Sequence, residues 1–467
     1  MAQEKPSLDT LLSSSGGKSF LFLGREGIYT KDEIARFLKK YNITMTKNYE
    51  EGVVGLVEHQ QLNPVEEDIS DAAYEQKIPL YKLLEFEKFF SKNLNSDELL
   101  MGIKLSNDQD RIFRLLGSAD IEEELFLKLL EMYEWHEDEE DNTKDRDVVM
   151  SILRRYIKIK PNEEDLLYSY LTLRRLATEA TNPKVLHALL SFPNYSFLVR
   201  GKAKTTLRET VAKNLYINKE VITKLMSLRD EKVDVAMAGN PALSLELLQK
   251  LASKERMEIN EAIATNPNID DILFEKLLSK EEKTVQLLLL SQTIDSKRLE
   301  LIDTFALSRD IFATLGANEQ LSEDVINMLI QREELSMLKN LCSNETLSSD
   351  QIEQLYNKGI EETYTALARN VKTAVMILET LYENYHEQID MLISLAYNKY
   401  TPEGILRALH EKDVFEINQA LATNAALPME LLDILKVDTR LQNELAQNEI
   451  FVKEYEAVFE YDGNAIR

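Results

Sequence analysis

The residues from Val211 to Leu278 decide the fold, because they contain the same sequence pattern three times. The copies are VAKNLYINKEVITKL at 211–225, AMAGNPALSLELLQKL at 236–251 and AIATNPNIDDILFEKL at 262–277. Each copy carries an asparagine, and the period of 26 residues extends along the chain to Asn370, after which the spacings are 28, 26 and 24. The repeat markers are Asn214, Asn240, Asn266, Gln292, Asn318, Asn344, Asn370, Asn398, Asn424 and Asn448. A period of this length predicts stacked supersecondary units.

Other positions keep the phase of the marker. Apolar residues recur three and seven positions before it, one helical turn apart, and a small residue recurs two positions before it. We therefore expect a first helix that ends at the marker, with the asparagine in the left-handed conformation. Caps such as Asn218, Ser244 and Asp270 then predict a second helix. The chain is expected to be mainly α, an α-solenoid of two-helix repeats whose buried asparagine amides bridge adjacent units.

The motif Ala-x-Asn-Pro-x-Leu-x-x-x-Leu-Leu resembles the repeat of the leucine-rich-repeat variant family of α-solenoids. The match is clearest at 236–251, 262–278 and 420–435. Some members of that family carry an iron–sulfur cluster on several cysteines. The single cysteine here, Cys342, takes the small-residue position of its repeat, so packing explains it and no cofactor is expected.

The sequence before the repeats has a different pattern. Residues 1–17 end in Ser-Ser-Ser-Gly-Gly and are expected to be flexible. From 18 to 94 short apolar, β-branched runs alternate with amphipathic stretches, which predicts a parallel sheet covered by helices. The expected strands are 20–23, 43–46, 53–57 and 78–81, and the expected helices are 31–38, 69–76 and 83–90.

Phe22-Leu23-Gly24, Val54-Gly55-Leu56-Val57 and the segment AYEQKIPL at 73–80 resemble a BRCT domain. The resemblance implies a small α/β module that docks onto another protein. Phosphopeptide-binding members of the family place Ser or Thr before the glycine and a lysine in the second helix. This chain has Leu23 there and no lysine between Glu66 and Gln76, so phosphate recognition is not expected.

Four segments follow from these patterns. They are a flexible N-terminus at 1–17, a BRCT-like domain at 18–94, a linker with degenerate helical repeats at 95–205, and a regular solenoid with a C-terminal cap at 206–467. The linker contains an acidic loop at 136–146, where residues 137–141 are all Asp or Glu. A divalent cation is one interpretation, but the alternation and glycine of a calcium loop are missing, so a solvated loop is preferred.

Charge reverses once along the chain. The formal net charge is −26, yet residues 154–213 hold twelve Lys or Arg against five Asp or Glu. One interpretation is a docking site for a polyanion such as DNA, or for an acidic protein. The other, which we favour, is a set of solvated helix faces. The candidate anion-binding residues, called here the basic island, are Arg154, Arg155, Lys158, Lys160, Arg174, Arg175, Arg200, Lys202, Lys204 and Arg208.

Catalysis has no support in the sequence. The five histidines lie far apart, and no phosphate-binding glycine loop, nucleophile elbow or metal-spaced cluster occurs. The leading hypothesis is a cytoplasmic, acidic, non-catalytic scaffold that binds another protein, without a membrane segment, metal, cofactor or small-molecule substrate. The alternative is a DNA-repair or DNA-processing protein that uses the basic island. A HEAT-like DNA glycosylase is the least favoured hypothesis.

Overall fold

The computed structural model describes residues 5–59, 61–136, 142–158, 170–198 and 203–453. The chain divides into two compact units, Met1–Ala236 and Met237–Arg467. Unit 1 begins with an α/β domain and continues mainly as helices, whereas the described part of unit 2 consists of helices and their connections. The predicted class, mainly α with a small N-terminal α/β domain, is confirmed.

The N-terminal domain is built on one parallel sheet with the strand order β2-β1-β3-β4. Alternate residues of β1 point to opposite faces, as strand geometry requires. Leu21 and Leu23 pack against the α3 side, and Phe20 and Phe22 pack against Phe86 of α4. The elements are β1 (Ser19–Leu23), α2 (Lys31–Lys40), β2 (Thr44–Thr46), β3 (Val53–Glu58), α3 (Pro64–Glu75), β4 (Leu80–Lys82) and α4 (Leu83–Asn93).

Two boundaries in this domain differ from the prediction. Residues 8–14, expected to be flexible, form helix α1 (Leu8–Ser14), because Ser7 caps the helix and Leu8 and Leu12 are buried. Helix α3 begins five residues before the predicted start. Asn63 caps it, Pro64 occupies its first turn, and Glu66 completes a capping box. Thr30 and Glu33 form the same motif at α2.

The rest of unit 1 is a run of helices with one small hairpin. The unexpected element is the antiparallel pair β5 (Ser196–Phe197) and β6 (Thr205–Thr206), which takes up the longer spacing between Asn182 and Asn214. The helices are α5 (Ser96–Ser106), α6 (Gln109–Leu116), α7 (Glu123–Met132), α8 (Thr143–Tyr156), α9 (Tyr170–Glu179), α10 (Pro183–Leu189), α11 (Leu207–Ala212) and α12 (Lys219–Ser227). Helix α13 (Glu231–Ala238) spans the division between the two units.

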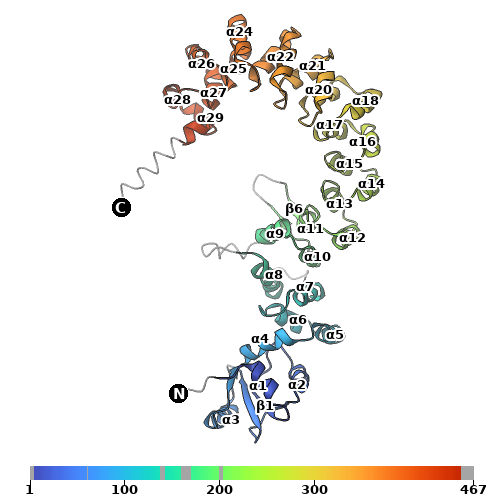
Figure 1. Ribbon diagram of the computed structural model, residues 1–467, viewed down its shortest axis with the longest axis vertical. Helices are drawn as coiled ribbons and strands as arrows, with labels where there is room; N and C mark the ends of the chain where they lie inside the picture. Colours follow the sequence, from blue (N-terminus) through green and yellow to red (C-terminus); the bar gives the residue numbers. More distant parts are fainter. Residues whose placement is uncertain (1–4, 60, 137–141, 159–169, 199–202, 454–467) are drawn as a thin grey trace. The chain divides into compact units, whose positions relative to one another are not determined.

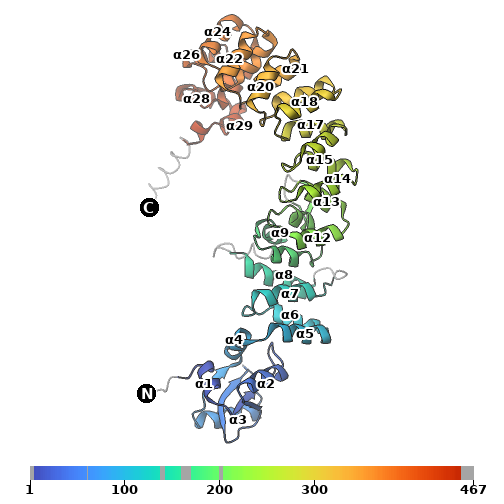
Figure 2. The same cartoon turned by 45° about the vertical axis from the view of Figure 1, so that its right-hand side comes forward.

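Unit 2 repeats the pair of short helices that the 26-residue period predicts, and both views show the pairs following one another (Figure 1 and Figure 2). First helices pack on first helices from α15 to α29, and second helices pack on second helices from α16 to α22. The first helices are α15 (Met257–Ala264), α17 (Glu282–Ser291), α19 (Arg309–Ala313) with the 3-10 turn η2 (Thr314–Ala317), α21 (Leu335–Cys342), η3 (Glu361–Thr363) with α23 (Tyr364–Arg369), α25 (Ile389–Tyr397), α27 (Phe415–Thr423), and η4 (Thr439–Leu441) with α29 (Gln442–Leu445). The second helices are α14 (Leu245–Ala252), α16 (Asp271–Leu278), α18 (Ser296–Thr304), α20 (Glu323–Ile330), α22 (Ser349–Asn357), α24 (Val375–Tyr385), α26 (Glu403–His410) and α28 (Met429–Leu435).

The marker asparagines end the first helices by a different device from the one predicted. Asn318, Asn370, Asn398 and Asn424 are extended, with φ between −72° and −80°, so the expected left-handed conformation is wrong. In the extended conformation the asparagine side chain is not held on the surface of its own helix. Its side-chain amide can therefore form hydrogen bonds with the preceding repeat. The left-handed residues of the repeat lie instead in turns from second to first helices, as at Asp413.

Candidate functional site

The marker side chains form a hydrogen-bond ladder in the interior of unit 2. Each asparagine donates from Nδ2 to two main-chain oxygens of the preceding repeat, at 2.7 to 3.2 Å, and its Oδ1 accepts the amide two residues later, at 2.8 to 3.1 Å. This pattern holds for Asn266, Asn344, Asn370, Asn398, Asn424 and Asn448. All of these side chains are at most 5% exposed. The ladder satisfies carbonyl groups at helix ends, so its role is structural.

Two irregular markers keep the ladder. Gln292 still donates from Nε2 to the Ala264 and Asn266 carbonyl oxygens, at 2.8 Å each. Asn398 comes 28 residues after Asn370, two more than the period. The extra residues lengthen α24, and Asn398 still donates to the Ala368 and Asn370 oxygens at 2.8 Å.

The small residue before each marker allows close backbone approach. A Cβ on Gly316 would meet the Met337 carbonyl oxygen and lie 2.8 Å from the Leu341 nitrogen. Cys342 holds the same position, and burial raises the pKa of its thiol to about 12. Such a thiol is a packing residue at neutral pH, because it carries almost no reactive thiolate.

Markers Asn214 and Asn240 lie on either side of the division between the units. Asn214 donates to the carbonyl oxygens of Ala177, Thr178 and Ala180 at the end of α9, at 2.9 to 3.0 Å. Asn240 is buried and accepts the Ala242 amide at 2.8 Å.

The described residues of the basic island are distributed over three helices and their connections. Arg154 and Arg155 lie on α8, Arg174 and Arg175 on α9, and Arg208 on α11, while Lys158 follows α8 and Lys204 precedes β6. Lys160, Arg200 and Lys202, which include the densest part of the predicted patch, lie outside the described residues. Helix α9 packs against both α8 and α11.

Several of these charges already have partners within unit 1. Arg155 donates to the Ile121 carbonyl oxygen, and its guanidinium lies 4.7 Å from the Phe126 ring centroid. Arg175 pairs with Glu179 on its own helix at 3.0 Å. The Nε atoms of Arg174 and Arg208 are buried. Among the described residues of the island, Arg154, Lys158 and Lys204 are exposed, and so is Arg175, which is paired with Glu179.

Residues 137–141 of the predicted acidic loop at 136–146 lie outside the described residues, and residues 143–146 belong to helix α8. In this helix Asp145 is buried, and its Oδ1 accepts from the Tyr133 hydroxyl at 2.8 Å and lies 2.9 Å from His136 Nδ1. Within the described ranges, no group of three or more His, Cys, Asp or Glu side chains is arranged to hold a metal ion.

In the N-terminal domain, the glycine of the predicted motif is bonded to its own chain. The Gly24 amide donates to Glu66 Oε1 at 3.0 Å, and the Asn63 amide donates to Glu66 Oε2 at 3.0 Å. These two bonds lower the pKa of Glu66. The Glu66 carboxylate therefore already accepts the hydrogen bond of the Gly24 amide, which a bound anion would otherwise accept.

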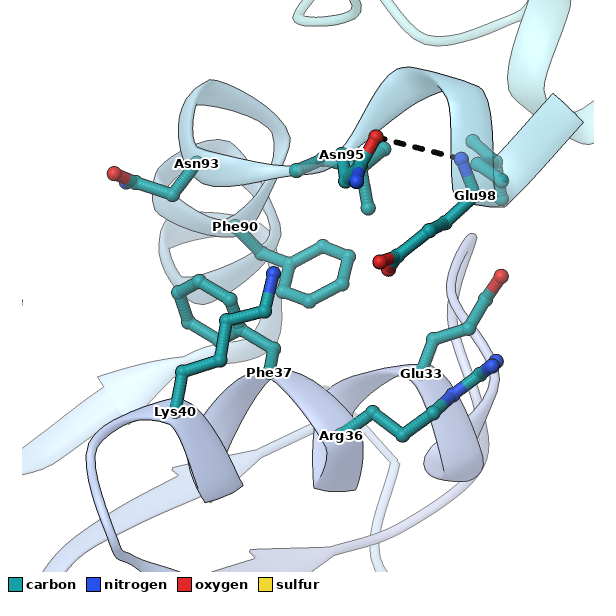
Figure 3. A pocket seen from close by; sticks show the side chains of 10 residues that line it. Glu33, Arg36, Phe37, Lys40, Phe90, Asn93, Asn95 and Glu98 are labelled. Carbon is teal, nitrogen blue, oxygen red and sulfur yellow. Dashed lines mark hydrogen bonds between the residues drawn. The ribbon is translucent and has the colours of Figure 1, made fainter.

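A second feature of this domain is a small cavity between α2, α4 and α5 (Figure 3). Phe37 and Phe90 meet edge to face, with centroids 4.9 Å apart, and the polar side chains around them include Glu33, Lys40 and Glu98. The cavity measures about 30 Å³, which is room for about one water molecule. It is too small for a substrate.

A larger cleft, which the sequence did not predict, lies at the carboxyl ends of β1, β3 and β4. Its volume is about 750 Å³, within the range of ligand-sized sites. Glu58 ends β3, Lys82 ends β4, and Glu87 of α4 is 6% exposed. The lining residues are Gly27, Glu58, His59, Leu62, Glu67, Lys82, Leu83, Leu84 and Glu87.

Comparisons with known proteins do not identify a functional site in this chain. Across the part of the chain that the structure describes, no helix has the length and apolar character needed to cross a bilayer. Family models, curated proteins and solved structures each give no match to this chain.

Proposed function

We propose that this protein is a non-catalytic scaffold for another protein: an α-solenoid of the leucine-rich-repeat-variant type that presents its first-helix face, with a BRCT-like N-terminal domain as a second docking module. The observation that supports the proposal most directly is the composition of one surface in unit 2. Residues one, four and five positions before each marker share a side of the first helices.

This surface, called here the first-helix face, contrasts with the rest of unit 2. Between Met237 and Lys453 the chain has 36 acidic and 20 basic residues. The exposed or half-exposed residues of the face include two acids and two bases. They are Gly239, Glu261, Ala262, Thr265, Leu287, Ser291, Thr314, Ala317, Lys339, Asn340, Ser343, Thr365, Ala366, Arg369, Ile393, Ser394, Tyr397, Gln419, Thr423, Asn443, Glu444 and Gln447.

Depletion of charge, with aromatic and arginine side chains present, is typical of the core of a protein interface. Arg369 lies over the Tyr397 ring, 4.2 Å from its centroid, which pre-orders two residue types enriched in binding hot spots. The ladder side chains are buried, whereas the residues of this face are at least partly exposed and open to contact with a partner.

Site-specific photo-crosslinking tests the proposal. A photoreactive residue at Ser394, on the first-helix face, is compared with one at Gln354, which is exposed on second helix α22. We expect one dominant crosslinked protein from position 394 and not from position 354. Equal products at both positions, or none at 394, would reject the first-helix face as the docking surface.

The alternative, nucleic-acid binding, is supported by the exposed Arg154, Lys158 and Lys204. It is tested with duplex and single-stranded DNA across a salt series, comparing the full chain with a variant in which these three residues become Glu. Arg208 is left intact because its buried Nε makes a folding defect the expected result of substitution. Binding that falls with salt and disappears in the variant would favour the alternative; absence of binding at low salt would reject it.

A further inference from the structure

We propose that the cleft at the carboxyl edge of the N-terminal sheet binds a lysine or arginine side chain of a protein partner, with apolar neighbours of that side chain resting on its leucines. This inference deepens the proposed function, because it rests on the N-terminal domain being a docking module and names the chemistry that the module recognises.

The position of the cleft is the first argument. In open sheets of parallel strands, ligands bind beyond the carboxyl ends of the strands, because the loops there diverge and leave a hollow. Three strands of this sheet end at the cleft: β1 followed by Gly27, β3 ending at Glu58, and β4 ending at Lys82.

The charge of the lining is the second argument. The lining has three carboxylates, Glu58, Glu67 and Glu87, against one lysine, Lys82, whose side chain is exposed, and one histidine, His59. The N-terminus of α4 also reaches the cleft. The partial positive charge that the helix dipole places there is offset by Glu85 in the first turn and by Glu87. An anion would meet an excess of like charge here, and the Gly24 amide nearby already bonds Glu66. A cation meets complementary charge.

The third argument is that the carboxylates are held in place. Glu87 Oε1 accepts the Ile28 amide at 2.6 Å, and a side chain on Gly27 would collide with that same oxygen, so only glycine leaves Glu87 where it is. Glu58 Oε2 accepts from the Ser70 hydroxyl at 3.0 Å. Preorganised acceptors lose less conformational entropy on binding than free side chains do.

The apolar part of the lining selects a side chain carried on a peptide over a small free cation. Leu84 is 62% exposed, and Leu62 and Leu83 are partly exposed beside it. The aliphatic stem of Lys or Arg, and an apolar residue next to it, would cover these leucines while the charged group reaches the carboxylates.

The test is a titration of the full chain, labelled with ¹³C at leucine methyl groups, with the capped peptide Gly-Leu-Arg-Leu-Gly. A peptide with citrulline in place of arginine keeps the shape and removes the charge, and butylamine supplies a cation without the peptide. We expect saturable shifts of the Leu62, Leu83 and Leu84 methyl signals with the arginine peptide. Affinity should be at least about tenfold weaker for the citrulline peptide and for butylamine.

Variants locate the site. The double substitution Glu58→Gln and Glu67→Gln should weaken binding at least about fivefold. The matched control, Asp71→Asn and Glu75→Gln, removes the same charge from exposed positions of α3 outside the lining and should change affinity by less than about twofold. Circular dichroism melting checks that both variants fold.

Equal affinity for the arginine and citrulline peptides, equal effects of the two variants, or no shift of the three leucines would overturn the proposal. Butylamine binding as tightly as the peptide would assign the cleft to small cations instead. None of these outcomes affects crosslinking at Ser394, so failure of the cleft and failure of the scaffold remain distinguishable.

Discussion

Removal of one side chain from the asparagine ladder should be among the most costly single changes in unit 2. Asn424 is 2% exposed, donates to the Ala396 and Asn398 oxygens at 2.7 and 3.1 Å, and accepts the Ala426 amide at 2.8 Å. Asn424→Ala removes three hydrogen bonds, each worth about 1 kcal/mol net, and leaves buried main-chain groups unpaired. We expect the free energy of unfolding to fall by about 3 to 5 kcal/mol.

Urea denaturation followed by circular dichroism measures this loss. Because each repeat contacts only its neighbours, a broken rung should also reduce the coupling between them, which lowers the apparent m value or splits the transition. The control is Asn384→Ala, at an exposed asparagine of α24, which should change stability by less than about 0.5 kcal/mol. If Asn424→Ala costs less than about 1 kcal/mol, the ladder is not a main source of stability.

Asn424→Asp separates the donor role from the acceptor role. A carboxylate at this position would face two carbonyl oxygens with no hydrogen to donate, so at neutral pH the variant should be less stable than Asn424→Ala. Burial and the carbonyl oxygens would raise the folded-state pKa above the unfolded value. The penalty should therefore shrink as pH falls through the raised pKa, when the acid regains a donor. A penalty independent of pH would contradict this account.

Three further predictions follow from the same packing. Gly316→Ala should lower the free energy of unfolding by about 2 kcal/mol or more, because the new Cβ would meet the Met337 carbonyl oxygen. Gly404→Ala places its Cβ in open space within α26, so in the same urea assay it should raise the free energy of unfolding by up to about 1 kcal/mol. Burial raises the pKa of Glu87, so its charged form costs stability; Glu87→Gln should stabilise the protein at pH 7.5, and the gain should vanish below the ordinary pKa of glutamate, as thermal melts at both pH values would show. The Cys342 thiol, buried and with a pKa of about 12, should react with Ellman's reagent at least about a hundredfold more slowly in the native protein than in guanidinium.

The helical repeat could be predicted because its determinants are local and periodic. Apolar residues at fixed distances before the marker specify a buried stripe, and the caps at Asn218, Asp270 and Ser348 accept helix amides as their sequence positions indicate. The same reasoning predicted the parallel sheet of the N-terminal domain and the places of its strands along the chain, but not the order of the strands within the sheet.

The features that escaped prediction depend on residues far apart in the chain. Gly27 and Glu87 meet only after the sheet has formed, so no local pattern indicates the cleft. The bridging of adjacent repeats by the marker amide was predicted, but the left-handed conformation assigned to the same residue was wrong. The carbonyl groups that the amide bonds belong to the preceding repeat, and this favours an extended residue. The hairpin at 196–206 has strands of two residues, too short to produce a periodic signal.

The basic island shows why a charge count overstates a binding site. Summing formal charges treats each side chain as free, yet Arg155 serves a carbonyl group and an aromatic ring, and Arg175 is neutralised by Glu179. Only contacts in the folded chain reveal how many cations remain for a partner. For this reason the DNA-binding test substitutes the exposed residues Arg154, Lys158 and Lys204 and not all ten residues of the basic island.

The ladder also separates stability from binding within each repeat. Its donors and acceptors are internal to a pair of adjacent units, so changes at marker positions such as Asn424 should appear first as lost stability. Exposed or half-exposed residues of the first-helix face such as Ser394 make none of the ladder side-chain donations, and changes there should leave stability nearly intact. Asn340 is not such a position, because it donates to the Ala313 carbonyl oxygen of the preceding repeat at 2.8 Å. A substitution that abolishes partner binding at unchanged stability should therefore map to the first-helix face or to the cleft. One that abolishes binding only together with stability carries no information about the docking surface.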